Sequence, residues 1–320
     1  MSFLMDGRTK HLATLTLVFA GLALSATTAS AQRRGRTTYS SRDYRSRIDT
    51  TIAFDKSGVV TVNAGSGDVV ITASTASTLH VRATSDDDDI RFDAARNSVE
   101  LSTARRGSDT RFEISVPIGA RVVAKSGSGD IVVRGTHGEV NVTAQSGDIL
   151  VDDVTGRLDV RSFSGEVTAS NVVGNIDIST QSGDLKLTDV RGDVEVSNTS
   201  GDITLRNVTA KLVRAKTTSG DVLYDGTIDP TGRYELTSHS GDIRLHVPRD
   251  ASAQLTVSTW SGEIESDFPM TLKPGDHSIG SSTSKKFTFA IGGGAARISA
   301  ETFSGDVTVS SNGRGANTRP

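Results

Sequence analysis

The central part of the chain repeats one pattern of apolar and polar positions. Counted from the Gly of each Ser-Gly-Asp or Ser-Gly-Glu phrase, apolar residues recur two, four and seven positions later, as Leu185 and Leu187 do after Gly183. Offsets of two and four are the alternation of a strand with one buried face. A second unit of this kind begins nine residues later and contains Val194 and Val196. Each repeat therefore predicts two short strands and two turns.

The phrase also recurs at a nearly fixed interval. From Gly129 to Gly201 it returns at every eighteenth position, and the intervals that follow are one position longer, then three positions longer twice. A period of this size is typical of a solenoid, whose repeats bury their apolar faces only by stacking on one another. A three-faced hexapeptide helix has a coil of the same length, but the repeating unit here is nine residues, not six.

We therefore expect an all-β, single-domain parallel β-solenoid, similar to a β-helix or a β-roll, with two short strands in each coil of about eighteen residues. Irregular capping strands are expected at both ends, because an uncovered terminal coil presents unpaired backbone groups. The longer intervals predict small loop insertions within consecutive coils. The pattern leaves the handedness and the cross-section open.

The Gly of each phrase is expected to form a corner between two strands. Gly adopts positive φ without steric cost, and the following Asp can accept hydrogen bonds from turn amides. The predicted structural turn residues are Gly129, Gly147, Gly165, Gly183, Gly201, Gly220, Gly241, Gly262 and Gly305.

Stacking would bring the acidic residues of these turns into a row. Two unit charges ~4.8 Å apart repel by about 1 kcal/mol in bulk water, so either turn amides or cations must compensate them. The candidate calcium ligands are Asp130, Asp148, Glu166, Asp184, Asp202, Asp221 and Asp242. Calcium needs roughly six to eight oxygen ligands, and calcium β-rolls carry several glycines per turn where this repeat has one. Turn capping is therefore preferred to metal binding, and no cofactor is expected.

Residues 1–31 have the three parts of a secretory signal peptide. Arg8 and Lys10 are basic, residues 12–24 are mostly apolar, and Ala29-Ser30-Ala31 is a small-residue cleavage site. We expect cleavage after Ala31, no transmembrane segment in the mature chain, and export to the periplasm, the cell surface or the medium.

The rest of the chain divides by composition and period. The predicted parts are a basic disordered linker at 32–50, N-terminal strands and cap at 51–125, the regular solenoid at 126–267, C-terminal coils and cap at 268–310, and a disordered tail at 311–320.

Composition excludes several classes of function. The chain has no cysteine, and hence neither disulfides nor the lipidated cysteine of a lipoprotein. Removing Arg8, Lys10 and Asp6 from the 35 basic and 38 acidic residues leaves 33 and 37, a formal net charge of −4. This charge predicts no nucleic-acid binding. The sequence has no Gly-x-Ser-x-Gly elbow. We expect no catalytic residues.

Four ring-bearing residues directly precede Ser-Gly-acid phrases: Phe163, His239, Trp260 and Phe303. Such residues can form an exposed stack or a sugar-contacting strip. The alternation along the strands favours inward-facing or corner-filling positions, which is the orientation we expect.

The succession of SGDI, SGEV, SGDL and SGDV turns, preceded by "FEISVPIGARVVAKSGSGDI" at Phe112 to Ile131, resembles the bacterial putative-adhesin family. The resemblance covers approximately residues 51–310. It implies strands that end in a "VP" phrase and lead into a parallel β-solenoid, and it brings no catalytic residues.

The expected function is that of an exported, non-enzymatic structural or interaction protein. Its elongated surface would bind a cell-envelope polysaccharide, another envelope protein or a second copy of the chain. One alternative is a calcium-binding module similar to a β-roll. Another is a polysaccharide-active enzyme on a β-helix scaffold, but such an enzyme needs clustered acids and aromatic platforms, and only 5% of this chain is aromatic.

Overall fold

The computed structural model describes residues 37–38, 46–86, 90–103, 110–269 and 285–312. These residues belong to one compact unit, Gly35–Pro320. Within them the regular elements are all β-strands, which form one sheet of 14 strands and one of 13, here sheet A and sheet B.

The strands of each sheet are given in spatial order. Sheet A contains β1 (Thr37–Thr38), β6 (Ile90–Ala94), β7 (Ser98–Thr103), β3 (Val59–Ala64), β9 (Arg121–Ser126), β11 (Val140–Ala144), β13 (Leu158–Ser164), β15 (Ile176–Ser182), β17 (Val194–Ser200), β19 (Leu212–Ser219), β21 (Arg233–Ser240), β26 (Ala296–Ser304), β23 (Ala253–Ser261) and β25 (Lys285–Ile291). Sheet B contains β2 (Ser46–Ala53), β5 (Thr78–Ser85), β8 (Thr110–Pro117), β4 (Gly67–Ser74), β10 (Ile131–Arg134), β12 (Ile149–Thr155), β14 (Val167–Val173), β16 (Leu185–Arg191), β18 (Ile203–Thr209), β20 (Val222–Gly226), β22 (Ile243–Pro248), β27 (Val307–Asn312) and β24 (Ile264–Ser266).

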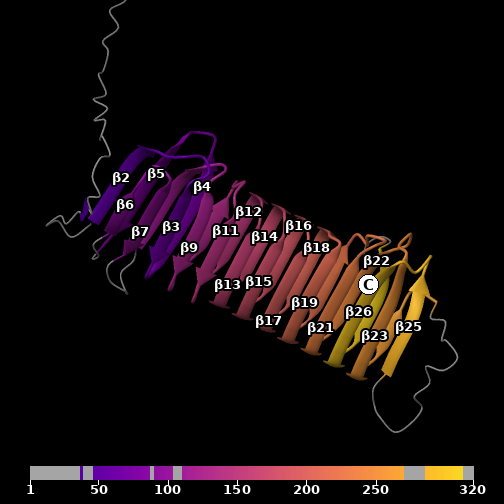
Figure 1. Ribbon diagram of the computed structural model, residues 1–320. Helices are drawn as coiled ribbons and strands as arrows, with labels where there is room; N and C mark the ends of the chain where they lie inside the picture. Colours follow the sequence, from indigo (N-terminus) through magenta and orange to yellow (C-terminus); the bar gives the residue numbers. More distant parts are fainter. Residues whose placement is uncertain (1–36, 39–45, 87–89, 104–109, 270–284, 313–320) are drawn as a thin grey trace, which may run out of the picture. The chain divides into compact units, whose positions relative to one another are not determined.

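In the regular part of the fold, strands pair in parallel with a shift of one repeat. Val140 aligns with Leu158 in sheet A, and Ile149 aligns with Val167 in sheet B, so the partners in each pair are one full repeat apart. From β10 to β22, successive strands along the chain alternate between the two sheets (Figure 1). The predicted parallel β-solenoid with two strands per coil is therefore confirmed.

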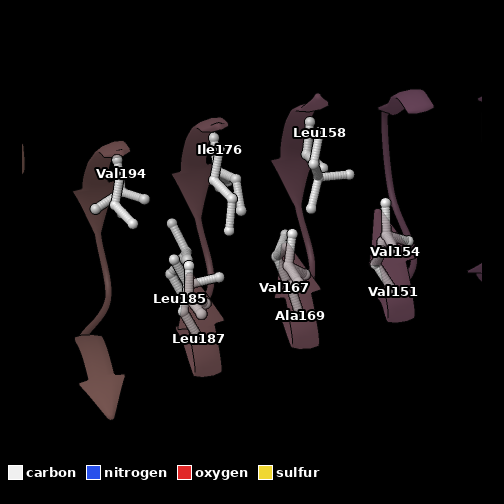
Figure 2. Packing of buried hydrophobic residues seen from close by; sticks show 14 of the residues in the cluster. Val151, Val154, Leu158, Val167, Ala169, Ile176, Leu185, Leu187 and Val194 are labelled. Atoms are coloured by element: carbon white, nitrogen blue, oxygen red, sulfur yellow. The ribbon is translucent and has the colours of Figure 1, made fainter. Parts of the chain in front are cut away.

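The apolar core lies between the two sheets. Ile176 and Ile178 of β15 are buried, as are Leu185 and Leu187 of β16. Figure 2 shows Ile176 on one side of this core and Leu185 on the other. Burying a side chain of this size stabilises the fold by roughly 1.5–3 kcal/mol, so the repeated alternation accounts for much of the stacking energy.

A bend within the regular strands of sheet B explains the third apolar offset. Its residues have φ between 51° and 56°, the left-handed region that Asp and Asn tolerate best. They are Asp153, Asn171, Asp189 and Asn207. The bend interrupts the alternation, so the next buried residue comes seven positions after the corner glycine instead of six.

The C-terminal coils stack in an order that differs from their order along the chain. The repeat predicts that Gly241 and Gly262 belong to consecutive coils. Instead, β26 lies between β21 and β23 (Figure 1). In sheet B, β27 lies between β22 and β24. Gly305 consequently lies between Gly241 and Gly262. The coils that contain Gly241 and Gly262 follow each other along the chain but are not neighbours in space, because the last coil of the chain lies between them.

This order corrects the predicted C-terminal cap. Residues 303–310, the last part of the predicted range 268–310, form an inner coil, while β25 pairs antiparallel with β23 at the edge of sheet A. β27 continues to Asn312, which lies within the predicted tail at 311–320. Residues 270–284, which belong to the predicted C-terminal coils and cap at 268–310, lie outside the described residues.

The N-terminal coils are also out of sequence order. β3 and β4 pair directly with β9 and β10, although β5 to β8 separate them along the chain. β7 and β8 pair in parallel with the other edges of β3 and β4. The antiparallel strands β6, β5 and β2 follow outward and cover these coils.

The predicted linker at 32–50 differs from the structure at its C-terminal end. β2 begins at Ser46 and pairs with β5, and Ile48, which alternates with polar neighbours, is buried by this pairing. The short strand β1 also falls within the predicted linker. Residues 1–36, which include the predicted signal peptide, lie outside the described residues. No helix among the described residues has the length and apolar character that crossing a membrane requires.

Two buried tyrosines support the inserted loop between β20 and β21. The rings of Tyr224 and Tyr234 meet edge to face, with centroids 5.7 Å apart. The Tyr234 hydroxyl donates to the carbonyl of Ala210 at 2.7 Å and accepts from the N–H of Asp229 at 2.8 Å. The Tyr224 hydroxyl donates to the carbonyl of Thr227 at 2.9 Å. Burial raises the pKa of Tyr224, so its hydroxyl remains a neutral donor.

Candidate functional site

The corner glycines bring successive coils too close together for a side chain. A β-carbon at Gly183 would lie 2.2 Å from the carbonyl oxygen of Gly165, and the φ of Gly183 is 114°. Gly262 lacks the positive φ, but a β-carbon there would lie 2.0 Å from the carbonyl oxygen of Gly305. The other predicted turn residues have positive φ: Gly129, Gly147, Gly165, Gly183, Gly201, Gly220, Gly241 and Gly305.

The acidic residues after these glycines form a row that backbone amides hold together. The N–H of Asp148 donates to Oδ1 of Asp130 at 2.9 Å, and the N–H of Glu166 donates to Oδ1 of Asp148 at 2.8 Å. Further along the row, the acceptors are Oδ1 atoms of Asp184, Asp202, Asp221, Asp242 and Asp306. We call this row, from Asp130 through Asp306 to Glu263, the carboxylate ladder. Charge-assisted bonds of this kind offset the repulsion between neighbouring carboxylates.

Basic side chains pair with other carboxylate oxygens of the ladder. Nζ of Lys186 donates to Oε1 of Glu166 at 2.9 Å, and this bond holds the pKa of Glu166 below its ordinary value of 4.5. Arg244 bridges two coils, donating to Oδ2 of Asp221 at 2.9 Å and to Oδ2 of Asp242 at 3.0 Å.

The ladder does not converge on a single point, as a calcium site would require. Within the described residues, no three His, Cys, Asp or Glu side chains are grouped in a way that could hold a metal ion. The candidate ligands, from Asp130 to Asp242, lie one per coil in a line. A calcium ion takes roughly six to eight oxygens around one point. The ladder instead offers single carboxylates whose Oδ1 atoms mostly accept a backbone amide.

A buried polar row lines the inner side of the same corners, and sequence analysis did not identify it. Nδ2 of Asn198 donates to the carbonyl of Gly183, and Oγ1 of Thr302 donates to the carbonyl of Gly241, both at 2.9 Å. The recurring Ser, Thr or Asn three positions before the corner glycines, except at Gly147, which Ala144 precedes, was the available signal. The row comprises Ser162, Thr180, Asn198, Thr217, Ser238, Thr259 and Thr302.

The residues that directly precede the Ser-Gly-acid phrases point outward, so their predicted inward orientation is wrong. Phe163, Trp260 and Phe303 are 57%, 43% and 48% exposed, and His239 is also exposed. The preceding residue, such as Thr302 before Phe303, is the one that faces the core. Alternation along the strand then directs the ring to solvent.

Three of these rings stack across neighbouring strands because β26 lies between β21 and β23. The centroids of the Phe303 and His239 rings are 4.9 Å apart, and the angle between the two ring planes is 14°. The centroids of the Phe303 and Trp260 rings are 5.8 Å apart, and the angle between those planes is 8°. We call His239, Phe303 and Trp260 the aromatic strip. Phe163 occupies the same position in its own repeat but is separated from the strip by β15, β17 and β19.

A groove of about 380 Å³ lies beside the aromatic strip and crosses β19, β21, β26 and β23. The strip forms one wall, and the buried polar row lies beneath it. The opposite wall is a row of outward side chains in register across the same strands: Lys216, Thr237, Glu301 and Ser258.

The polar wall of this groove carries one positive and one negative charge. Oε1 of Glu301 accepts a hydrogen bond from the Ser299 hydroxyl at 3.0 Å. In the part of the chain that the structure describes, neither Lys216 nor Glu301 forms an ion pair. The groove can therefore present ring edges on one side, and hydroxyl, ammonium and carboxylate groups on the other, to a ligand that is apolar along one edge and polar along the other.

These features define the chain as a parallel two-sheet β-solenoid with a partly aromatic groove on its outer surface. Residues 105–310 match the family described as Toastrack DUF4097, and the chain belongs to that family. The match covers β8 to β26 and the part of β27 that ends at Ser310. It confirms the family resemblance seen in the sequence.

No curated protein matches the chain. A putative cell adhesion protein from Clostridium sporogenes is 9% identical, over 83% of this chain and 100% of that one, with a TM-score of 0.21. Putative adhesins from Bacteroides fragilis and Parabacteroides merdae are 13% and 12% identical over 83% of this chain and 97% and 96% of theirs, with TM-scores of 0.36 and 0.40. At these TM-scores the similarities support no conclusion about this chain.

Proposed function

We propose that this chain is an exported, non-enzymatic interaction protein of the adhesin-like type, which binds a cell-envelope partner through the groove beside the aromatic strip. The observation that carries the proposal is the exposed stack of His239, Phe303 and Trp260. Exposed aromatic side chains that gather in one place are typical of binding surfaces, because contiguous apolar groups in contact with water often mark interaction sites and aromatic residues are enriched in interfaces.

The groove also favours binding over catalysis. Glycoside hydrolysis generally uses a pair of carboxyl groups on either side of the scissile bond. Among the described residues that line the groove, Glu301 is the single carboxylate. The binding function therefore fits the lining better than the alternative of a polysaccharide-active enzyme.

Retention on envelope fragments tests the binding proposal. The mature chain, starting at Gln32, is mixed with envelope fragments of the bacterium that encodes it, and the sedimented fraction is measured. We expect the native protein to sediment, Phe303→Ala to remain largely in solution, and Phe163→Ala to sediment like the native protein. Phe163 is the matched control because it is an exposed aromatic residue at the same position of its repeat. A native protein that stays in solution, or equal retention of the Phe303 variant, would contradict the proposal.

Export is tested separately by the mass of the mature chain and by protease treatment of intact cells. The signal features of residues 1–31 predict a mature N-terminus at Gln32. Degradation by added protease would indicate exposure on the cell surface, and protection would indicate the periplasm. An uncleaved chain recovered from the cytoplasm would show that the export proposal is wrong.

A further inference from the structure

We propose that the groove binds a linear, uncharged polysaccharide that lies along the stacking direction of the coils. This inference rests on the proposed function and specifies its ligand. The groove crosses four neighbouring strands of sheet A, which are spaced by ~4.8 Å. A sugar unit of a linear polysaccharide has a similar length, so each strand can contact about one unit, and the register of the side chains can match the repeat of the ligand.

The two walls match the two kinds of surface on a sugar chain. The C–H groups of a pyranose ring are apolar and can make van der Waals contacts with the exposed part of the aromatic strip. Its hydroxyl groups can donate to the carboxylate of Glu301, accept from the ammonium of Lys216, and exchange hydrogen bonds with Thr237. Hydrogen bonds to charged groups are the stronger kind, so these two residues would contribute most to orientation.

The charges of the groove favour an uncharged ligand. Lys216 and Glu301 have opposite charges and are both directed to solvent along the same wall. A strongly anionic polysaccharide would gain from Lys216 but would be repelled by Glu301. A neutral sugar chain uses both groups as hydrogen-bonding partners without this penalty.

The position of the groove within the sheet disfavours a peptide as the ligand. A peptide usually binds a sheet by adding a strand at its edge, where backbone N–H and C=O groups are unpaired. Here β21 and β26 are inner strands whose backbones pair with neighbours on both sides. A peptide lying across them could bond only to side chains, and its own backbone groups would lose water without matching partners.

Titration calorimetry of the mature chain with defined sugars tests this inference. The probes are hexasaccharides of β-1,4-linked glucose, N-acetylglucosamine and xylose, their monosaccharides, a hexasaccharide of galacturonic acid and a proline-rich peptide. We expect an uncharged hexasaccharide to bind at least about tenfold more tightly than its monosaccharide, since several strands contribute contacts. Trp260→Ala and Phe303→Ala should each weaken that binding about tenfold or more, the usual effect of removing a central aromatic residue.

Two further variants make the result specific. Glu301→Gln retains the size of the side chain and should weaken binding while the circular dichroism spectrum is unchanged. Phe163→Ala should bind as tightly as the native protein. The inference is overturned if no uncharged hexasaccharide binds, if the acidic sugar or the peptide binds more tightly, or if Phe303→Ala binds like the native chain.

Failure of this inference can be distinguished from failure of the proposed function. Periodate cleaves the carbon–carbon bond between neighbouring hydroxyl-bearing carbons, and lysozyme or a chitinase cleaves 1,4-linked N-acetylglucosamine chains, which have no such pair, so envelope fragments treated with both lose their polysaccharide structure. Loss of sedimentation after treatment supports the polysaccharide ligand. Retention on treated fragments that still depends on Phe303 overturns it and leaves the proposed function intact. Absence of binding to untreated fragments contradicts the proposed function itself.

Discussion

At the scale of single residues, the fold depends on backbone conformations that few residue types adopt. The corner glycines were predictable, because a Gly at each sharp turn is a direct consequence of its freedom at positive φ. The left-handed Asp and Asn bends were missed, although Asp or Asn stands six positions after Gly147, Gly165, Gly183 and Gly201. The alternation of apolar residues was easier to see than the polar residue that interrupts it.

Substitution of a corner glycine in the middle of the solenoid should be strongly destabilising. Gly183→Ala introduces a β-carbon 2.2 Å from the carbonyl oxygen of Gly165 and forces alanine to a φ of 114°. We expect a loss of at least about 2 kcal/mol in the free energy of unfolding, measured by chemical denaturation. Gln181→Ala, an exposed neighbour, should change it by less than about 0.5 kcal/mol. Similar stability of both variants would contradict the crowded corner.

Removal of divalent cations should leave the fold unchanged. Turn amides bind one oxygen of most ladder carboxylates, so repulsion is compensated without metal, as between Asp130 and Asp148. The melting temperature, followed by circular dichroism, should be the same in calcium and in chelator. A clear rise in melting temperature with calcium would instead support the β-roll-like alternative.

At the scale of strands, neighbouring coils are joined by polar contacts on the outer faces as well as by the core. Glu235 accepts hydrogen bonds from Arg214 at 3.1 Å and from Arg233 at 2.6 Å. The bond from Arg214 contributes most to holding the pKa of Glu235 below its ordinary value of 4.5. The pKa of Asp152 is lowered chiefly by the hydroxyl of Ser170, which belongs to the next coil.

These carboxyl groups predict a loss of stability in acid. Their pKa values are lower in the folded chain than in the unfolded chain, so their contribution is fully present above the unfolded values and disappears as the pH falls through the folded ones. The melting temperature should therefore decrease as the pH falls below about 4.5, the ordinary value for Glu235. The effect per group is small, under about 1 kcal/mol, because the pairs are solvated. Glu235→Gln should reduce the slope, and an unchanged slope would show that this pair is not involved.

The order of the terminal coils was the main feature of the fold that the sequence did not reveal. A fixed spacing of the Ser-Gly-acid phrases predicts which coils are neighbours in space only where coils that follow each other along the chain also stack on each other. The interval from Gly220 to Gly241 and the interval from Gly241 to Gly262 have the same length. The first contains the inserted loop between β20 and β21, whereas the second joins two coils that are separated in space by the last coil. Length alone cannot distinguish these two connections.

Truncation tests the inserted coil directly. Ending the chain after Gly294 removes β26 and β27, which leaves β21 and β23 without the strand that pairs with both. We expect aggregation or a melting temperature at least several degrees lower, because unpaired inner strands expose apolar and backbone groups. A chain that ends after Asn312 retains all described strands and serves as the control. Equal stability of the two truncated chains would contradict the observed coil order.

At the scale of the whole molecule, the candidate binding site exists because of this coil order. His239, Trp260 and Phe303 are far apart in sequence, and they stack only because the last coil lies between the two that precede it. The Ser-Gly-acid phrase that follows each ring was visible in the sequence. The exposure of the three rings and their contact with one another were not. The inserted coil thus links the packing of the solenoid end to the proposed binding function.

Tryptophan fluorescence tests the central claim, ligand binding at the aromatic strip, most directly. Trp260 is the chain's single tryptophan and is 43% exposed, so its emission reports on the strip alone. Titration with soluble fragments of the envelope polysaccharide should produce a saturable change in emission, and this change should be abolished or much weaker in Phe303→Ala. Unchanged emission at concentrations where calorimetry shows binding would place the ligand elsewhere and contradict the account.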